Sequence, residues 1–143
     1  MAEQRLSVRM HGLPAAELIQ DDAGRLWLAY LPGEQPVLSL SLPRGAERLG
    51  PTVVEPFFGN LLPEGELARE AIARQAGANP RNTLSLLRAI GQECAGAISL
   101  HDPEAPVVAV DPVEVRARVL DAEELARHLK DLPRRPLLMG LDG

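Results

Sequence analysis

Hydrophobic and polar residues alternate in the first third of the chain and follow a helical spacing after it. Residues 6–10 alternate apolar and polar side chains, the period of two that is typical of a half-buried strand, and Gly12 ends the run. Residues 18–20 then lead into a cluster of turn formers at 21–24. The next stretch, 25–31, is apolar on both faces and predicts a central strand. Together these segments predict an antiparallel hairpin.

A second alternating stretch follows a Pro-Gly break at 32–33. Residues 38–42 read Leu-Ser-Leu-Ser-Leu, which predicts another half-buried strand that Pro43 closes. Residues 44–55 combine two glycines, a proline and charges of both signs. We expect them to form a surface loop.

Both phenylalanines of the chain lie in the stretch 56–65, although the whole chain has only four aromatic residues. The apolar residues here recur at i, i+1, i+4 and i+5. One short helical turn that ends at Pro63 would therefore direct all four to a common core: Phe57, Phe58, Leu61 and Leu62. Because large aromatic side chains dominate small cores, we interpret the two rings first as a hydrophobic plug under the sheet.

Two helices are predicted directly after this turn. The first opens at 64–66 and ends at Gly77, a suitable residue to follow a helix. The second begins at Asn79-Pro80, as N-cap and first helical residue, and ends at Gly91. The inward positions of the first helix are assigned from their spacing: Leu67, Ala68, Ala71 and Ile72.

The last third of the chain has weaker strand patterns and one well-marked helix. Residues 97–100 predict a short strand, and the turn 101–106 follows it. The segments 107–110 and 113–119 are further strand candidates. In the helix predicted over 121–132, an aspartate at the N-cap and a glutamate three residues later resemble a capping box.

Composition excludes several classes of protein. The chain has 143 residues, the length of one domain, with a net charge of −5 and no run rich in Lys and Arg. Proteins that bind nucleic acid usually carry a basic patch, so we expect no direct contact with nucleic acid. The N-terminus lacks the apolar segment of a signal peptide, and no run approaches the ~18 apolar residues of a membrane span. These patterns predict a cytoplasmic protein with no membrane contact.

No metal or cofactor site is predicted. Cys94 is the only cysteine and has no metal-ligand companion at useful spacing, so we expect a buried, unreactive thiol. His11 and His128 also lack a second ligand nearby in the sequence.

Three stretches resemble the amino-terminal region of HipA-like toxin kinases, the kinase half of a bacterial toxin–antitoxin pair. Residues 57–65 (FFGNLLPEG) resemble the FFxNLLPEG signature of that family. Residues 86–100 resemble its LLxxIGxDcaGAvsL segment, with Glu93 in place of the usual Asp, and 38–43 resembles its LSLSLP strand. The blocks occur in the family's order and cover roughly residues 5–102.

The resemblance implies an α+β fold, a small antiparallel β-sheet or barrel packed with two to three helices. We expect residues 1–106 to form this amino-terminal subdomain and 107–143 to form an extension with weak strands and the helix 121–132. In the family, the nucleotide loop and kinase core would follow where this sequence stops.

The chain shows none of the sequences that phosphoryl transfer requires. A kinase needs a Gly-rich phosphate loop, a lysine on the phosphates, a catalytic Asp and metal ligands. No such loop and no H-R-D or D-F-G sequence occurs, and Lys130 is the only lysine. The pair His101-Asp102 lies in a proline-bounded turn and is typical of solvated loop residues. We therefore predict that the chain is not an enzyme and needs no cofactor.

The resemblance leads to a main functional hypothesis and an alternative. The first is a regulatory module that binds and restrains a HipA-like kinase as an antitoxin, with a DNA-binding antitoxin subunit reached through the complex. One form of this hypothesis is a stand-alone HipS-like protein. The alternative is the amino-terminal fragment of an active HipA-like Ser/Thr kinase. A small-molecule binding module is a third, weaker hypothesis. Candidate partner contacts are Trp27, Phe57, Phe58, Asn60 and Glu64.

Overall fold

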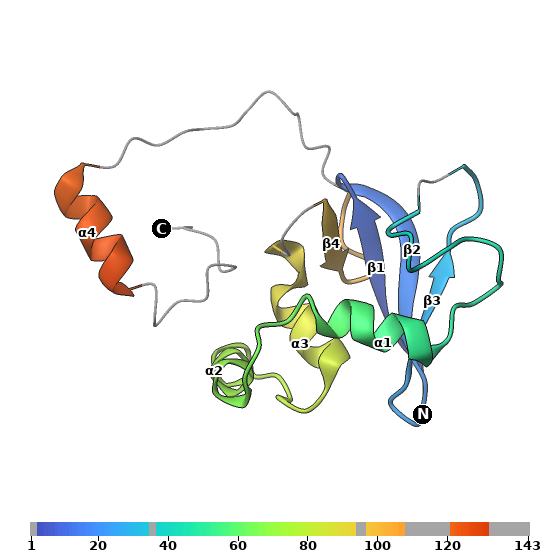
Figure 1. The fold of residues 1–143 in the computed structure, drawn as a ribbon, viewed down its shortest axis with the longest axis horizontal. Helices are drawn as coiled ribbons and strands as arrows, with labels where there is room; N and C mark the ends of the chain where they lie inside the picture. The colour runs from blue at the N-terminus through green and yellow to red at the C-terminus, as the bar shows by residue number, and fades with distance from the viewer. Residues whose placement is uncertain (1–2, 35–36, 94–96, 108–120, 132–143) are drawn as a thin grey trace.

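Four antiparallel strands form the sheet on which the described chain is built (Figure 1). This computed structural model describes residues 3–34, 37–93, 97–107 and 121–131. The strands lie in the order β3-β2-β1-β4 and span β1 (Gln4–Met10), β2 (Leu13–Gln20), β3 (Leu26–Tyr30) and β4 (Ile98–His101). The predicted α+β class is confirmed. Among the described residues, β3 and β4 do not pair with each other, so the sheet is open.

Strand β2 begins earlier than the sequence pattern suggested. A two-residue turn with positive φ at both positions, His11 (50°) and Gly12 (81°), joins β1 to β2. The pairing register shifts between Val8 and Arg9, so Ala15 and Ala16 are both buried. This irregularity interrupts the alternation that reveals a strand in a sequence, because a bulge inserts one residue into the repeat of two.

Strand β3 lies at the edge of the sheet, so the prediction of a central strand was wrong. Its outer side is nevertheless covered. The backbone N–H and C=O of Leu28 bond to Leu49 at 3.1 and 2.8 Å, and the N–H of Leu26 donates to the Glu55 carboxylate at 3.3 Å. These bonds block the edge against pairing with another chain.

The strand predicted over 38–42 does not form, and the segment turns instead. The N–H of Leu42 donates to the Ser39 carbonyl at 3.0 Å, and the Tyr30 hydroxyl donates to the Leu42 carbonyl at 2.6 Å. That hydroxyl also accepts from the N–H of Leu38 at 3.0 Å. Leu38 and Leu42 are buried, whereas Leu40 is 95% exposed, an arrangement that a strand could not produce because all three would share one face.

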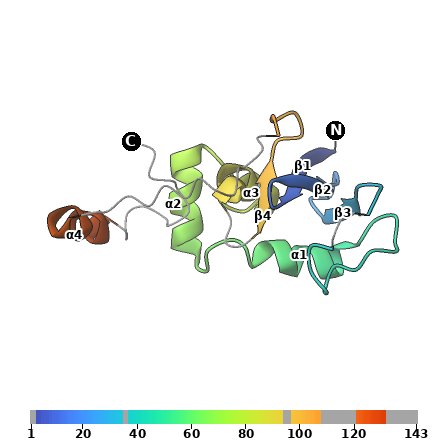
Figure 2. The same ribbon diagram turned by 90° about the horizontal axis from the view of Figure 1, so that it is seen from above.

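Helix α1 covers one face of the sheet, and the loop that follows β4 lies on the other side (Figure 2). The helices span α1 (Pro51–Gly59), α2 (Glu66–Ala76), α3 (Thr83–Ile90) and α4 (Ala122–Asp131), with a short 3-10 turn at Gly91–Glu93. Helix α1 is longer than the predicted aromatic turn. It begins at Pro51, so residues 51–55 of the predicted loop 44–55 are helical. Pro51 starts the helix, since proline fits the first helical position.

The glycines predicted at the ends of α2 and α3, Gly77 and Gly91, are confirmed, whereas the predicted N-cap of α3 is wrong. Gly77 follows α2 in the left-handed conformation, as predicted, with φ of 65°. The N-cap of α3 is Asn82 and not Asn79, because the Asn82 side chain accepts from the N–H of Ser85 at 2.9 Å. Asn79 instead accepts from the N–H of Arg81 at 3.0 Å and closes the preceding turn.

The capping box of α4 is confirmed. The Asp121 carboxylate accepts from the N–H of Glu124 at 2.8 Å, and the Glu124 carboxylate accepts from the N–H of Asp121 at 3.3 Å. Each side chain thus accepts a hydrogen bond from the backbone N–H of the other residue at the start of the helix. Three predictions fall outside the described residues: the strand candidates from Val108 onward, the buried thiol of Cys94, and Leu132 as the last residue of this helix.

The core lies between the sheet and the helices. Alternate residues of the strands face it, and each has almost no exposed surface: Leu6, Val8, Leu18, Leu28 and Leu100. The helices supply Val54, Phe58, Ile72, Leu84 and Leu87 to the same cluster. The rings of Phe57 and Phe58 meet edge to face with centroids 5.1 Å apart. The predicted hydrophobic plug is therefore present, with Phe58 at its centre and Phe57 partly buried at its margin.

Gly91, the residue after α3, has no room for a side chain. A Cβ there would lie 2.7 Å from the Cβ of Leu100 on β4. We expect Gly91→Ala to lower the free energy of unfolding by about 1–2 kcal/mol, because α3 and β4 must separate. Urea denaturation measures this loss. Gly59→Ala is the matched control, because a Cβ at Gly59 meets nothing within 4 Å; an equal loss in both variants would contradict the close approach.

Candidate functional site

The sequence block 53–67 places several exposed side chains on α1 and at the start of α2. Val53, Phe57 and Asn60 follow one another at i, i+4 and i+7, so they share the outer face of α1. Val53 is 41% exposed, Asn60 is exposed and Phe57 is half-buried. Glu64, two residues before α2, is exposed, and Leu67 in the first turn of α2 is 83% exposed. We call these five residues the α1–α2 surface.

Three of the five predicted partner contacts lie on the α1–α2 surface: Phe57, Asn60 and Glu64. Phe58 is fully buried, so it supports the surface from beneath. Leu67 and Ala71 were assigned to the inner side of α2, and these assignments were wrong, because both are exposed. The buried Ile72 lies five residues after Leu67 and about 140° around the helix, so Leu67 and Ile72 cannot share one face. The spacing of apolar residues alone gives no signal that would have placed Leu67 at the surface.

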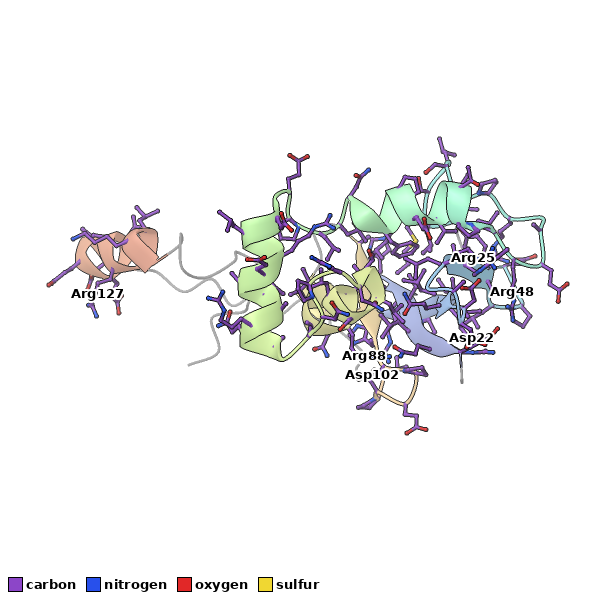
Figure 3. The ribbon with its side chains drawn as sticks, turned by 90° about the horizontal axis from the view of Figure 1, so that it is seen from below. Asp22, Arg25, Arg48, Arg88, Asp102 and Arg127 are labelled. Atoms are coloured by element: carbon purple, nitrogen blue, oxygen red, sulfur yellow. The ribbon has the colours of Figure 1, made fainter. Side chains whose placement is uncertain are left out.

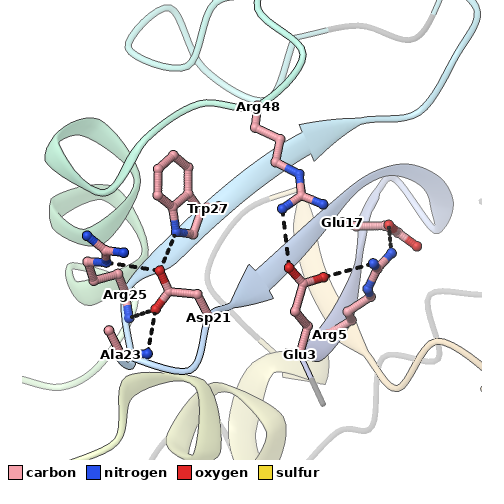
Figure 4. Close-up of polar contacts among 8 residues, drawn as sticks. All are labelled: Glu3, Arg5, Glu17, Asp21, Ala23, Arg25, Trp27 and Arg48. Atoms are coloured by element: carbon pink, nitrogen blue, oxygen red, sulfur yellow. Dashed lines mark hydrogen bonds and ion pairs between the residues drawn. The ribbon is translucent and has the colours of Figure 1, made fainter. Parts of the chain in front are cut away.

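Trp27 lies apart from that surface, on the opposite face of the sheet. Strand alternation directs Leu26 and Leu28 into the core and Trp27 away from it. The Trp27 ring is half-buried, and its indole N–H donates to the Asp21 carboxylate at 3.0 Å (Figure 4). Arg25 lies over the ring, 5.9 Å from its centroid. The indole is thus held by local contacts.

Asp21 accepts several hydrogen bonds, which favour its charged form. The Trp27 indole, the Arg25 backbone N–H and the Arg25 guanidinium lower the pKa of Asp21 to about 2. Since the folded pKa is below the ordinary 3.8, the stabilisation by Asp21 is present above 3.8 and is lost as the pH falls toward about 2.

We expect the fluorescence of Trp27, the only tryptophan, to report this titration directly. Protonation of Asp21 weakens the bond to the indole, so emission should change with a midpoint near pH 2. Asp21→Asn cannot titrate and should abolish the change. A midpoint close to 3.8, or a transition that survives in the variant, would contradict the assignment.

The same face of the sheet carries a chain of ion pairs (Figure 4). Arg5 bonds to Glu3 and to Glu17, each at 3.0 Å, and Arg48 bonds to Glu3 at 3.4 Å. All four side chains are about one third to two fifths exposed. Exposed pairs of this kind contribute little to stability. They make this face a charged surface of balanced sign.

Two shallow hollows meet at Arg81. One, of about 430 Å³, lies beside the start of α2 and is lined by Gly65, Glu66, Arg69, Glu70, Pro80 and Arg81. The other, of about 380 Å³, is lined by Gln20, Ala23, Gly24, Leu26, Glu55, Arg81, Asn82 and Thr83. Ligand pockets are usually apolar with a few polar groups. These linings are mainly polar, and they do not favour the small-molecule hypothesis.

A short segment after β4, residues 102–106, closes over a buried arginine on β1; we call it the 102–106 strap. The Arg9 side chain donates to the carbonyls of Ala105 and Pro106 at 2.6 and 3.1 Å, and only 4% of Arg9 is exposed. Asp102 accepts from Arg88 of α3 at 3.1 Å (Figure 3). The strap therefore ties the end of the sheet to α3.

His101 precedes the strap and was considered as half of a catalytic pair with Asp102. Burial of the ring lowers the pKa of His101 below its ordinary value of 6.5, and the nearby Arg9 charge lowers it further. The imidazole exchanges a hydrogen bond with the Ser99 hydroxyl at 2.9 Å, while Asp102 pairs with Arg88. The structure thus gives the two side chains separate partners.

Within the part of the chain that the structure describes, no three His, Cys, Asp or Glu side chains converge as metal ligands would. The described helices are also all too short or too polar to span a bilayer.

Comparison with known proteins identifies the family to which this chain is similar. Residues 6–101 match the family model of the HipA N-terminal domain. A solved chain of the Shewanella oneidensis MR-1 toxin–antitoxin complex of HipA, HipB and operator DNA superposes with a TM-score of 0.66 and 26% identity, over 96% of this chain and 32% of that one.

Two curated relatives come from Sinorhizobium fredii. The protein named Putative kinase Y4mE is 36% identical over 149 residues, which cover 100% of this chain and 35% of the relative. Putative kinase Y4dM is 41% identical over 110 residues, 69% of this chain and 27% of the relative. The chain thus spans about a third of the length of these relatives.

Proposed function

The chain belongs to the family of HipA N-terminal domains, and from this premise we propose that it is a non-catalytic regulatory module of a HipA-like toxin–antitoxin system. It binds a HipA-like Ser/Thr kinase in the cytoplasm and restrains it, acting as an antitoxin. The module is residues 1–106, and residues 107–143 form an extension toward the kinase.

One observation supports the proposal most directly: residues 6–101 match the family model of the HipA N-terminal domain, and the relatives that share this segment are named as kinases. Supplying this subdomain in trans would hold the kinase in an inactive arrangement.

The α1–α2 surface is the best candidate for contact with the kinase. It combines exposed Leu67 and Val53 and a partly buried aromatic ring with two polar side chains, and interfaces contain both apolar and polar groups. Three of its five residues lie in the sequence block 57–65 that carries the family signature. Trp27 is a secondary candidate on the other face.

A second function is supported by the relatives. Both Sinorhizobium proteins are named as kinases, and the matched segments make up only 35% and 27% of their lengths. In this alternative the chain is the amino-terminal part of a HipA-like kinase whose catalytic core follows in the same protein. Reading the coding sequence beyond Gly143 separates the alternatives: a Gly-rich loop and catalytic Asp there would establish the longer kinase.

The main proposal is tested by co-expression with the kinase-like reading frame beside this gene, pull-down and an autophosphorylation assay. We expect a stable complex in which autophosphorylation is suppressed. Binding without suppression would reduce the chain to a structural subunit, and no binding would overturn the proposal. Phosphotransfer by the isolated 143 residues would overturn the non-catalytic assignment.

The contact surface is tested in the same assay with two matched leucine substitutions. Leu67→Glu should weaken the complex, because Leu67 is 83% exposed on the α1–α2 surface. Leu40→Glu is the control, since Leu40 is 95% exposed on the loop after β3. Equal binding by both variants would show that the α1–α2 surface does not contact the kinase.

A DNA-binding antitoxin subunit is a further proposed partner, reached through the kinase. The matched Shewanella structure is described as a complex of HipA, HipB and operator DNA. The present chain has a net charge of −5, so we propose no direct contact with DNA.

A further inference from the structure

Helix α4 carries an apolar stripe that no described part of the chain covers. Four residues at i, i+3, i+4 and i+7 form it: Ala122, Leu125, Ala126 and Leu129. Leu125 is 48% exposed and Leu129 is 57% exposed, and both alanines are exposed. Figure 1 shows α4 apart from the sheet and from the other helices. The stripe is therefore available to another surface.

Local interactions within its own sequence, and not contacts with the core, favour the formation of helix α4. The capping box of Asp121 and Glu124 starts it, and acidic residues in the first turn favour the positive end of its dipole. A ten-residue helix is nevertheless marginal in water, because few backbone bonds offset the cost of nucleation. Packing of the apolar stripe on a partner would supply the missing stabilisation.

We propose that the apolar stripe of α4 docks into an apolar groove on the kinase part of a HipA-like kinase. This inference rests on the proposed function and adds a second contact to the α1–α2 surface. The family domain match ends at residue 101, but the similarity to the Sinorhizobium protein Y4mE covers the whole chain and only 35% of that relative. Helix α4 thus lies in a segment that this longer relative shares beyond the domain.

The charges beside the stripe specify the groove further. Glu123 and Lys130 flank the stripe on the same side, about 100° and 80° around the helix from Ala122, one near each end. The groove should therefore place a cationic side chain near the start of α4 and an anionic one near its end.

A second copy of the chain fits the stripe less well than a kinase does. Ten helical residues extend only about 15 Å. Two such helices side by side bury far less than the roughly 1,200 Å² of a stable interface. A kinase that also contacts the α1–α2 surface can reach that area.

The experiment compares binding of the full chain and its variants to the kinase isolated in the co-expression assay. The test variant is Leu125→Ala/Leu129→Ala, which removes the apolar surface and keeps helix-favouring residues. The matched control is Arg127→Ala, which helical spacing places on the face of α4 opposite the stripe. We expect the double variant to bind roughly tenfold or more weakly and the control to bind as the unaltered chain does.

Hydrogen exchange provides an independent readout of the same contact. Amides of α4 should gain protection when the kinase is added to the unaltered chain but not when it is added to the double variant. Circular dichroism and Trp27 fluorescence of the free variants check that the domain stays folded, which we expect because the stripe is not part of the core cluster.

The outcomes separate this inference from the proposed function. A complex that the double variant forms with unchanged affinity would overturn docking through α4 and leave the regulatory module in place. No complex with the unaltered chain would overturn both. Sedimentation of the free chain tests the other occupant. If the unaltered chain formed a dimer and the double variant were a monomer, the stripe would bind a second copy, and docking on the kinase would be overturned.

Discussion

Phe58→Ala is expected to lower the free energy of unfolding by about 3–5 kcal/mol, the largest effect of any single substitution in α1. The Phe58 ring is fully buried and meets the Phe57 ring edge to face at 5.1 Å. Truncation removes its buried apolar surface and leaves a cavity between α1 and the sheet, because the backbone of a packed core relaxes only in part. Since a domain of this size is stable by only about 5–15 kcal/mol, urea denaturation should show a large shift.

Two further variants distinguish core packing from a general weakness of α1. Val53→Ala, on the exposed side of the same helix, should change the unfolding free energy by less than about 0.5 kcal/mol. Phe58→Leu keeps most of the apolar volume and should lose less than half as much as Phe58→Ala. If Phe58→Ala and Val53→Ala proved equally mild, the aromatic plug would not be the centre of the core.

Arg9→Ala is expected to cost about 2–3 kcal/mol and to release the 102–106 strap. The guanidinium donates two hydrogen bonds to strap carbonyls, and bonds from a charged donor contribute more than neutral ones. Its long stem also fills space on the face of β1. The stabilisation by these contacts is partly offset by the cost of burying the guanidinium charge, since the Nε of Arg9 has no hydrogen-bond partner in the described chain.

The local effect of this substitution can be measured apart from the global one. Amide exchange of residues 102–106 should accelerate in Arg9→Ala, and the pKa of His101 should rise because the nearby Arg9 charge is removed. Arg5→Ala on the same strand is the control, since Arg5 makes exposed ion pairs that contribute little. A strap that exchanges equally slowly in Arg9→Ala would show that Arg9 does not hold it.

The titration of His101 gives the Arg9 site a pH dependence with a definite sign. The folded pKa of His101 lies below the ordinary 6.5, so its contribution to stability is present above 6.5 and is lost as the pH falls below that value. Burial of the ring is the larger cause, so Arg9→Ala should reduce this loss without abolishing it.

About half of the candidate site could be predicted from the sequence. Phe57, Asn60 and Glu64 were recognised from the family signature, and the structure places them at or near the surface. The same signature does not separate Phe57 from Phe58, because which side of a helix faces the core depends on where the helix meets the sheet. Leu67 was missed for the same reason, since spacing alone does not decide which of two apolar sides of α2 is buried.

The features that could be predicted correctly depend only on interactions between neighbouring residues. These include the strand alternation of 6–10, the left-handed Gly77 after α2 and the capping box at Asp121. Each depends on backbone preferences or hydrogen bonds within a few residues, and each was predicted correctly.

Features that join distant parts of the chain could not be predicted, because they form only when the fold brings those parts together. Tyr30 bends residues 38–42 into a turn through its hydroxyl, although their alternation predicts a strand. Arg9 stands at a polar position of β1, yet a strap 96 residues later in the sequence buries it. The physical reason is the same in both cases: a buried polar group must find its partner wherever the fold brings one, and no local pattern in the sequence records that distance.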